Sequence, residues 1–425
     1  MRIGVAGLGT VGVGLLQLLA DERRAGRARI EATVTAICAR DRRRDRGIDL
    51  ADMTWVDDPV ALAASDEIDV FVELMGGASG AAKTAVETAL EAGKPVVTAN
   101  KALIAAHGLS LARLAEERGT ALKFEAAIAG GVPIVRGLRD GLALCHTERL
   151  SGILNGTCNF ILDKMTAEGA AFDEVLKEAQ EAGYAEADPS FDIDGIDAAH
   201  KLHILAMIAF DAALPDDAVT AQGITGVGLG DLAMATRLDR VMKLVAEARQ
   251  QGDGLALRVT PALVPYDHAF AQAHGPGNAV SVTASPLGDL LFAGPGAGGG
   301  ATAAAVAADL CTLARGDGGP VFASPAMRLR EVTIADAGDI QDIYALRLPL
   351  AADHGALDDL VTDIEAAGVG IDRLDLPPSL GTAGDIDAIA VTTSVKARDL
   401  RSVLDKLSAQ SALRHAPGAY PMIDP

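Results

Sequence analysis

Residues 1–12 of the chain read MRIGVAGLGTVG, an apolar run interrupted by glycines. The first six residues predict a buried strand, and those after them predict a helix that runs to about residue 22. Gly7, Gly9 and Gly12 have the spacing of the dinucleotide fingerprint. In that motif the first glycine permits a tight turn, the second lets the backbone approach a pyrophosphate, and the third allows close packing of helix on strand. The same turn is predicted to bring two further residues to the ligand, Thr10 and Val11.

A regular alternation of strand and helix follows this turn. Strands are predicted at residues 33–39, 70–75, 95–99 and 121–126, with helices near residues 81–92 and 107–118. The alternation is typical of an α/β fold with a Rossmann-type, doubly wound parallel sheet. Ligands of such sheets bind beyond the carboxyl ends of the strands. Lys101 leaves a strand end directly, which favours a role at the ligand over a role on a helix surface.

A basic run lies at the end of the second predicted strand. Arg40 follows that strand directly, and Arg42, Arg43 and Arg44 come shortly after it. An acid at this point hydrogen-bonds the ribose 2′-hydroxyl of NAD, whereas an arginine accommodates the 2′-phosphate of NADP. The run therefore favours NADP(H), with NAD(H) as the alternative because Asp41 lies among the arginines. A solvent-exposed charge run without a ligand is the structural alternative.

Composition and charge restrict the class of protein. The 425 residues are enough for two or three domains, and 49% of them are apolar. The net charge of −21 argues against nucleic acid or an anionic membrane as a partner. No apolar stretch has the length of a membrane span, and no cleavage site follows the apolar N-terminal run. The 4 cysteines lack metal or redox spacing, which predicts reduced thiols in a cytoplasmic protein.

A second informative stretch, residues 179–201, reads AQEAGYAEADPSFDIDGIDAAHK. It feeds a segment, residues 198–210, that is apolar around most of a helix and is therefore predicted to be buried. Asp197 and Lys201 are four residues apart, so they project from one face of that helix. A surface ion pair, worth roughly 0.2–0.5 kcal/mol, is the ordinary alternative. A buried lysine instead needs a partner or a functional reason to leave water, which favours a role in a cavity.

This stretch resembles the signature segment of homoserine dehydrogenases, with matched spacing from Ala179 to Lys201. The resemblance implies NAD(P)H-dependent interconversion of L-aspartate 4-semialdehyde and L-homoserine, in threonine, methionine and isoleucine biosynthesis. It also implies that Lys201 donates a proton to the nascent alkoxide and that Asp197 holds its ammonium. The other residues that the resemblance assigns are Glu186 and Asp192, for the substrate α-ammonium, and Gly183, for the cofactor. One small departure is His200, where the family often has a charged base.

Residues 155–160 resemble a segment at the substrate cleft of the same family. The resemblance implies that Gly156 and Thr157 contact the substrate. The alternative is purely structural, because Asn155 and Thr157 are both residues that cap helix N-termini.

Two further segments resemble cofactor contacts of the family. Residues 98–101 are similar to the segment whose lysine lies between nicotinamide and substrate, which implies cofactor contacts for Thr98 and Lys101. Residues 294–302 are similar to the segment with which the chain returns to the cofactor, which implies a contact from Gly298.

Residues 124–133 resemble the family's loop for a monovalent cation, Na⁺ or K⁺. The resemblance implies an oxygen ligand from Glu125 and backbone carbonyl ligands from Ile128, Gly130 and Val132. Hard oxygen ligands suit such an ion. The alternative is an ordinary strand-to-helix turn in which glycines supply positive φ.

The chain is expected to divide into three domains. Residues 1–132 with about 296–315 are expected to bind the dinucleotide, residues 133–295 to bind substrate and dimerise, and residues 316–342 to form a linker. An amphipathic helix is predicted at residues 237–249. Residues 343–425 resemble an ACT regulatory domain, in which His354 replaces the usual proline of the first turn. That resemblance implies L-threonine as an effector and a homodimer or homotetramer.

Two alternatives differ from this reading in function. One keeps the fold and transfers a hydride to another amino-acid semialdehyde or from another hydroxy acid. The second is a threonine-responsive binding protein without catalysis, which would require the loss of Lys201 or Asp197. The chain has both residues, so the catalytic reading is favoured.

Overall fold

The computed structural model describes residues 1–350, 355–376, 386–408, 410 and 412–423. The chain divides into two compact units. The first contains Met1–Leu154, His200–Ala218 and Gly277–Val332, and the second contains Asn155–Ala199, Val219–Pro276 and Thr333–Pro425. The three-domain division expected from the sequence stays a prediction.

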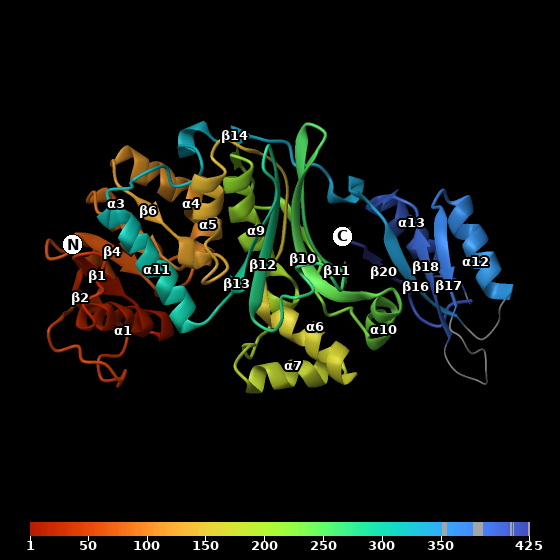
Figure 1. Ribbon diagram of the computed structural model, residues 1–425, viewed down its shortest axis with the longest axis horizontal. Helices are drawn as coiled ribbons and strands as arrows, with labels where there is room; N and C mark the ends of the chain where they lie inside the picture. Colours follow the sequence, from red (N-terminus) through yellow and green to blue (C-terminus); the bar gives the residue numbers. More distant parts are fainter. Residues whose placement is uncertain (351–354, 377–385, 409, 411, 424–425) are drawn as a thin grey trace. The chain divides into compact units, whose positions relative to one another are not determined.

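The first unit is built on a parallel sheet with the strand order β3-β2-β1-β4-β5-β6 (Figure 1). Its strands are β1 (Arg2–Ala6), β2 (Thr33–Cys38), β3 (Thr54–Trp55), β4 (Val70–Glu73), β5 (Val96–Thr98) and β6 (Leu122–Lys123). Residues of β1, β4 and β5 are almost all buried, because apolar runs in such strands pack on both faces. The predicted Rossmann-type α/β class is confirmed.

Two groups of helices cover this sheet. The helices α1 (Thr10–Arg24) and α11 (Gly299–Ala314) share one apolar core with it, in which Leu15 and Val306 are fully buried. They pack so closely at Gly299 that a side-chain carbon added there would lie 2.5 Å from Cγ2 of Thr10. The helices α2 (Pro59–Ala64), α3 (Ala81–Glu91) and α4 (Lys101–Glu117) pack in sequence against one another as the second group.

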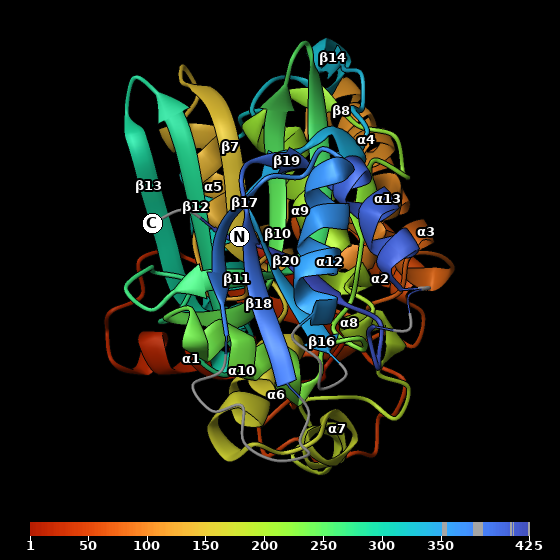
Figure 2. The same cartoon turned by 90° about the vertical axis from the view of Figure 1, so that its right-hand side faces the viewer.

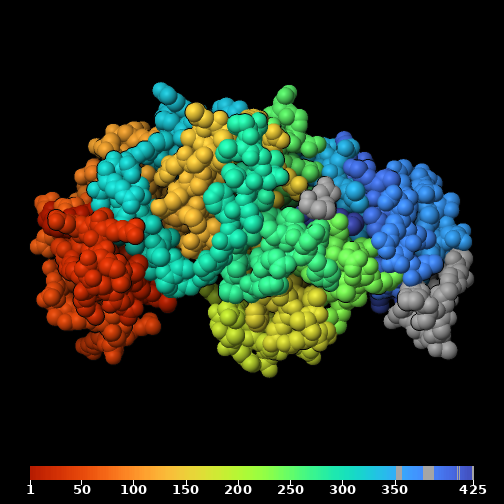
Figure 3. All heavy atoms as spheres, in the orientation of Figure 1, coloured from red at the N-terminus to blue at the C-terminus, as the bar shows by residue number. Residues whose placement is uncertain are grey.

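The rest of the first unit is an antiparallel set of strands and one buried helix. The strands β7 (His146–Ile153), β12 (Gly277–Ser285) and β13 (Gly288–Pro295) pair in the order β13-β12-β7. The strand β13 lies on the face of the molecule drawn in Figure 3. The helix α9 (Ile196–Ala209) enters this unit at His200, and its apolar residues from Leu202 to Ile208 are buried, as predicted. The unit also contains the short helix α5 (Ile134–Arg136) and a small parallel pair of strands, β8 (Ala212–Ala213) with β14 (Arg330–Glu331).

The second unit carries a long hairpin where the sequence predicts a helix. Its first part contains α6 (Gly156–Glu168), α7 (Phe172–Glu181), α8 (Ser190–Ile193), β9 (Val219–Ala221), α10 (Leu229–Arg237), β10 (Arg240–Gln251) and β11 (Gly254–Pro265). The prediction of a helix at residues 237–249 is wrong, because β10 pairs antiparallel with β11 along its whole length. Charges at Lys243 and Glu247 imitate a polar helix face, yet both side chains are buried in ion pairs, with Asp163 and Arg258 respectively.

The C-terminal part of this unit is a small α/β module (Figure 2). It runs β16 (Tyr344–Leu350), α12 (Gly355–Ala366), β17 (Ile371–Asp375), β18 (Ile386–Thr392), α13 (Ala397–Leu407) and β20 (Gly418–Pro421), with a small pair β15 (Gln341–Asp342) and β19 (Val395–Lys396) beside it. The strand order β17-β18-β16-β20 is that of the ferredoxin-like split βαβ arrangement. Both helices share one core with the sheet. His354, which stands where an ACT domain usually has proline, lies outside the described residues.

Candidate active site

The glycine turn after β1 has the geometry that the fingerprint requires. Gly7 has φ of 106°, and a side-chain carbon there would lie 2.4 Å from the carbonyl oxygen of Leu74. A side-chain carbon on Gly12 would lie 2.1 Å from the carbonyl oxygen of Gly7, so the turn and the helix can close only on glycine. A side-chain carbon on Gly9 would have no protein atom within 4 Å. Gly9 therefore leaves open space at the N-terminus of α1, where backbone N–H groups attract an anion.

A cavity of about 330 Å³ lies at this end of the sheet and collects the residues that the sequence singles out. It brings together Lys101 and Lys201, which are far apart in the sequence, with Val11 of the glycine turn. Its other lining residues are Leu74, Met75, Gly76, Ala99, Asn100, Ala126, Ala127, Ala129, Gly130, Gly296, Ala297 and Thr302. All of them belong to the first unit. Two ammonium groups beside a helix N-terminus fit an anionic cofactor and a reaction that builds negative charge on oxygen.

Lys201 is fixed in position by the backbone. Its side chain is 9% exposed, and Nζ donates a hydrogen bond to the Leu154 carbonyl oxygen at 2.6 Å. The side-chain amide of Asn278 donates to the same carbonyl at 3.2 Å. On the continuous helix α9, Lys201 stands one turn after Asp197. An ammonium has three N–H donors, so the Leu154 bond orients the group without using its whole capacity.

Lys101 is the first residue of α4, a helix that begins earlier than the sequence predicts. Asn100 caps it, because the Asn100 side-chain oxygen accepts a hydrogen bond from the Leu103 N–H at 3.1 Å. The same side chain donates to the Gly77 carbonyl at 2.8 Å. Asn100 therefore ties the start of α4 to the loop after β4 and places Lys101 at the cavity wall.

Sequence reasoning missed Glu73, which organises this wall. Its side chain is fully buried, and one carboxylate oxygen accepts hydrogen bonds from the N–H groups of Met75 and Gly76 at 2.7 and 3.1 Å. The other oxygen accepts a hydrogen bond from the Thr98 hydroxyl at 2.6 Å. The hydroxyl of Thr98, predicted to contact the cofactor, thus also holds β5 to β4. The available signal was an acid that ends an apolar strand just before two glycines.

The two acids predicted to serve substrate and catalysis come together in the second unit. The side-chain amide of Asn155 donates to a carboxylate oxygen of Asp192 and to one of Asp197, each at 2.8 Å. Asp197 is 2% exposed, and Asn155 is 4% exposed. The Asn155 side-chain oxygen accepts from the Cys158 N–H at 2.7 Å, so the capping alternative also holds.

The other substrate residues predicted from the sequence lie around the start of α6 and the turn after α7. The Thr157 hydroxyl donates to the Tyr184 carbonyl at 2.9 Å and so holds that turn. Gly156 is in close contact with another loop, because a side-chain carbon on it would lie 2.9 Å from Cα of Pro276. Gly183 follows α7 with φ of 76°, and Glu186 is exposed in the same turn.

A basic cluster stands beside the glycine turn. Arg40 is exposed after β2, and the guanidinium groups of Arg42 and Arg46 each lie 5.6 Å from the ring centre of Trp55. Arg46, which sequence reasoning missed, also donates through Nε to the Leu8 carbonyl at 3.3 Å. The Asp41 carboxylate accepts from the Arg43 N–H at 2.8 Å and so stabilises the turn that carries these arginines.

The predicted cation loop is held by internal hydrogen bonds. The buried Glu125 carboxylate accepts from the N–H groups of Val135 and Arg136, at 2.9 and 3.0 Å, and from the Arg136 side chain at 2.8 Å. Burial, with the nearby Glu125 charge, raises the pKa of Asp309 to about 7. Gly130 has φ of 55° and packs against Gly296. In the described part of the chain, no cluster of three or more His, Cys, Asp or Glu side chains is placed to hold a metal.

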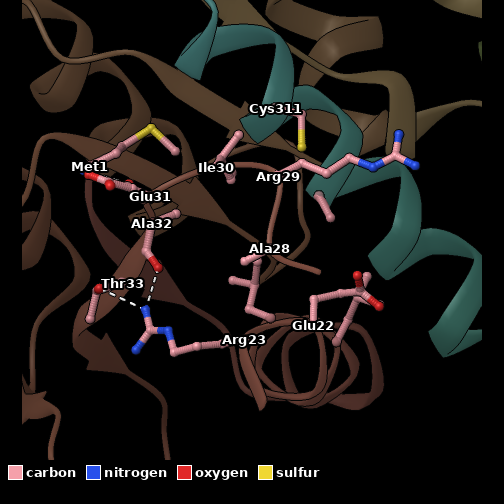
Figure 4. A pocket seen from close by; sticks show the side chains of 13 residues that line it. Met1, Glu22, Arg23, Ala28, Arg29, Ile30, Glu31, Ala32, Thr33 and Cys311 are labelled. Carbon is pink, nitrogen blue, oxygen red and sulfur yellow. Dashed lines mark hydrogen bonds between the residues drawn. The ribbon is translucent and has the colours of Figure 1, made fainter. Parts of the chain in front are cut away.

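A larger cavity, of about 610 Å³, lies at the opposite end of the same sheet (Figure 4). Met1, Ala32 and Thr33 line it, and they stand at the starts of β1 and β2, away from the carboxyl ends that bind ligands. Arg23 donates to the Ala32 carbonyl and the Thr33 hydroxyl at 2.6 and 2.8 Å, so its guanidinium connects α1 to the start of β2. This cavity is therefore distinct from the dinucleotide site.

Comparison with known proteins confirms the resemblance. Residues 133–311 match the homoserine dehydrogenase family, and residues 7–125 match its NAD-binding domain. Homoserine dehydrogenase of Neisseria gonorrhoeae is 40% identical over 385 residues, which cover 88% of this chain and 87% of that protein. The enzyme of Synechocystis is 36% identical over 429 residues, which cover 98% of each chain.

Solved structures agree with the sequence comparison. A homoserine dehydrogenase from Thiobacillus denitrificans superposes with a TM-score of 0.90 at 37% identity and covers 100% of this chain and 98% of its own. A hyperthermophilic archaeal homoserine dehydrogenase mutant in complex with NADPH has a TM-score of 0.64 at 28% identity and covers 75% of this chain and 99% of its own. The chain therefore belongs to the homoserine dehydrogenase family of nicotinamide-dependent oxidoreductases that act on a CH–OH group.

Proposed function

We propose that the chain reduces L-aspartate 4-semialdehyde to L-homoserine with NADPH, and that Lys201 is the proton donor. The observation that carries this proposal is the cavity at the glycine turn, where Lys201 lies with Lys101. The reduced nicotinamide supplies the hydride that reaches the aldehyde carbon. The aldehyde oxygen then bears negative charge and takes a proton from Nζ of Lys201, which gives the alcohol.

Asp197, one turn before Lys201, supports the ammonium in this scheme and helps to orient the substrate. Asp192 and Glu186 receive the α-ammonium of the substrate, with Gly156 and Thr157 at the same segment. Lys101 serves the polar end of the substrate and the nicotinamide. The hydrogen bonds of Asn155 to both aspartates support a shared location for these acids.

NADP(H) is the proposed cofactor, in preference to NAD(H). Arg40 and the two arginines stacked on Trp55 provide positive charge beside the glycine turn. Asp41, the residue that would favour NAD, has its carboxylate bonded to a backbone N–H. The pyrophosphate is proposed to lie over Gly9, with Thr10, Val11, Gly183 and Gly298 as further contacts.

A monovalent cation, Na⁺ or K⁺, is proposed to bind the loop from Glu125 to Val132. The Glu125 carboxylate already accepts hydrogen bonds from the protein, so the better ligands are the backbone carbonyls of Ile128, Gly130 and Val132. A cation there would supply positive charge and stiffen the loop. Thermal unfolding in Na⁺, K⁺ and tetramethylammonium chloride tests this site, because only the bound ions would raise the unfolding temperature.

The C-terminal module is proposed to be an ACT-like domain that responds to L-threonine, in a cytoplasmic homodimer or homotetramer. Its ferredoxin-like strand order supports this assignment. Free cysteines at four positions agree with a reducing compartment. In the described part of the chain, no helix is long and apolar enough to cross a membrane. Threonine titration of the activity and light scattering of the purified chain would test the effector and the assembly.

A substrate panel tests the reaction itself. Purified wild type is given NADPH or NADH with L-aspartate 4-semialdehyde, other amino-acid semialdehydes and, in reverse, homoserine and small hydroxy acids. We expect the highest kcat/KM for NADPH with L-aspartate 4-semialdehyde. A clear preference for another aldehyde would favour the related-dehydrogenase alternative, and no turnover of any substrate would favour a binding protein.

A further inference from the structure

Asn155 stands between β7 and α6 with every polar group of its side chain engaged. Its amide nitrogen donates to Asp192 and Asp197, and its amide oxygen accepts from the Cys158 N–H. A backbone N–H can only donate, so the bond from Cys158 identifies the oxygen and turns the NH₂ group toward the two carboxylates. The side chain is 4% exposed, which leaves water little access to compete for these bonds.

The two carboxylates need this neutral partner. Asp192 lies on α8 and Asp197 in the first turn of α9, so no shared helix fixes their separation. Like charges at close range repel one another, and more strongly where water is excluded. An amide that gives one N–H to each carboxylate offsets the repulsion without neutralising either charge, whereas a lysine in its place would compete with the substrate ammonium.

Leu154, the residue before Asn155, holds Lys201 in position. The carbonyl of Leu154 accepts from Nζ of Lys201 at 2.6 Å, and the side chain of the next residue, Asn155, binds Asp197. Asp197 and Lys201 of α9 are therefore each bonded by one of two adjacent residues that directly follow β7.

We propose that Asn155 is a positioning residue that sets the distance between the carboxylate for the substrate ammonium, Asp192, and the carboxylate that supports Lys201, Asp197. This inference rests on the proposed roles of those acids. A substrate whose ammonium is held by Asp192 would then lie at a fixed distance from Asp197. Small errors of placement in such a site reduce the rate strongly, because reacting groups must meet at near-contact distance.

Helix capping is the competing explanation for Asn155, and two substitutions separate it from positioning. Serine caps helix N-termini about as well as asparagine, but its shorter side chain cannot reach both carboxylates. Aspartate keeps the shape of the side chain and an oxygen for the Cys158 N–H. It replaces the NH₂ donor by an oxygen, so that a third carboxylate group faces those of Asp192 and Asp197. Asn155→Ser thus removes the hydrogen bonds to Asp192 and Asp197 and keeps a helix cap. Asn155→Asp keeps the cap and puts a repulsive negative charge where the two carboxylates had a donor.

The experiment is NADPH oxidation with L-aspartate 4-semialdehyde by the full-length wild type, Asn155→Ser and Asn155→Asp over a range of pH, with NADPH binding and thermal unfolding measured in parallel. We expect Asn155→Ser to bind NADPH like wild type while kcat/KM falls by at least about tenfold, since two charge-assisted bonds are lost. Asn155→Asp should be poorly active at neutral pH and recover as the pH falls, because one proton shared among three carboxyl groups restores a donor.

The pH profile separates positioning from a structural role. The titratable side chains that are hydrogen-bonded to Asn155 are Asp192 on α8 and Asp197 on α9, and Asn155→Asp adds a carboxyl group between them. If Asn155→Ser does not fold, the pH profile of Asn155→Asp decides. Variants with wild-type kcat/KM and an unshifted profile would overturn the positioning role, whereas a wild type that never reduces the aldehyde would reject the proposed function itself.

Discussion

Substitution of Glu73 by glutamine tests how the cavity wall is held. The carboxylate accepts two backbone N–H groups, from Met75 and Gly76, and the hydroxyl of Thr98. Hydrogen bonds to a charged group contribute about 1.5–3 kcal/mol each, and neutral ones about 0.5–1.5 kcal/mol. Glutamine keeps one oxygen for the two N–H groups and turns its NH₂ toward Thr98. The change from charged to neutral bonds should therefore cost about 2 kcal/mol of unfolding free energy.

Alanine at the same position would be less informative. It leaves the buried hydroxyl of Thr98 without its acceptor, at about 1–3 kcal/mol, and it also frees the more exposed N–H groups of Met75 and Gly76. Truncation of this fully buried side chain also leaves a cavity, so the loss of stability would combine two causes that the measurement could not separate. Glutamine is the substitution whose effect can be measured.

The assay for Glu73→Gln combines urea unfolding with fluorescence titration of NADPH. Because the loop from Met75 to Gly76 lines the cavity, its loosening should raise the Kd for NADPH about tenfold, which corresponds to about 1.4 kcal/mol. Glu67→Gln is the matched control, since Glu67 is exposed and precedes the same strand, and its effect should stay within about 0.5 kcal/mol. Unfolding and NADPH binding like wild type in Glu73→Gln would refute the reasoning.

Three further predictions concern the cofactor and the buried acids. Gly9→Ala should unfold like wild type, because no protein atom lies within 4 Å of the added carbon. Calorimetry should nevertheless find NADPH binding at least about tenfold weaker, since the methyl group occupies the space through which the pyrophosphate approaches the backbone. Arg40→Gln should raise the KM for NADPH about tenfold and leave that for NADH unchanged, because one charge-assisted bond to the 2′-phosphate is lost; equal effects on both cofactors would remove Arg40 from recognition. The pKa of Asp309 is raised to about 7 by burial and by Glu125, so its contribution to stability is full below its ordinary pKa of 3.8 and is lost as the pH rises through 7. Asp309→Asn should flatten this fall in urea-unfolding free energy between those pH values, and an unchanged slope would contradict the assignment.

Local patterns predicted the first unit well because its signals are steric and short-range. The positions of Gly7 and Gly12 are restricted by atoms within a few ångströms, so their spacing alone indicates the turn. The sequence indicates Lys101 and Lys201 for separate reasons, one at a strand end and one on an apolar helix, and the fold brings both to one cavity.

The missed features depend on partners far away in the sequence. The strand β10 has charges at helical spacing, and their burial depends on partners from other elements, among them the carboxylate of Asp163 and the guanidinium of Arg258. Arg46, which follows β2, likewise contacts Leu8, which follows β1 and is 38 residues away in the sequence. Glu73 lies in an ordinary strand sequence, and its importance follows from the turn after β4 and from the last residue of β5, which both donate hydrogen bonds to its carboxylate.

The central claim is that the buried ammonium of Lys201 protonates the oxygen of the reduced aldehyde. The most direct test is the turnover of L-aspartate 4-semialdehyde by Lys201→Ala, with Lys201→Arg as the variant that keeps charge but cannot readily give up its proton. We predict that kcat falls by about 10²-fold or more in both variants while the Kd for NADPH stays close to that of wild type. A kcat near the wild-type value in Lys201→Ala would contradict the account.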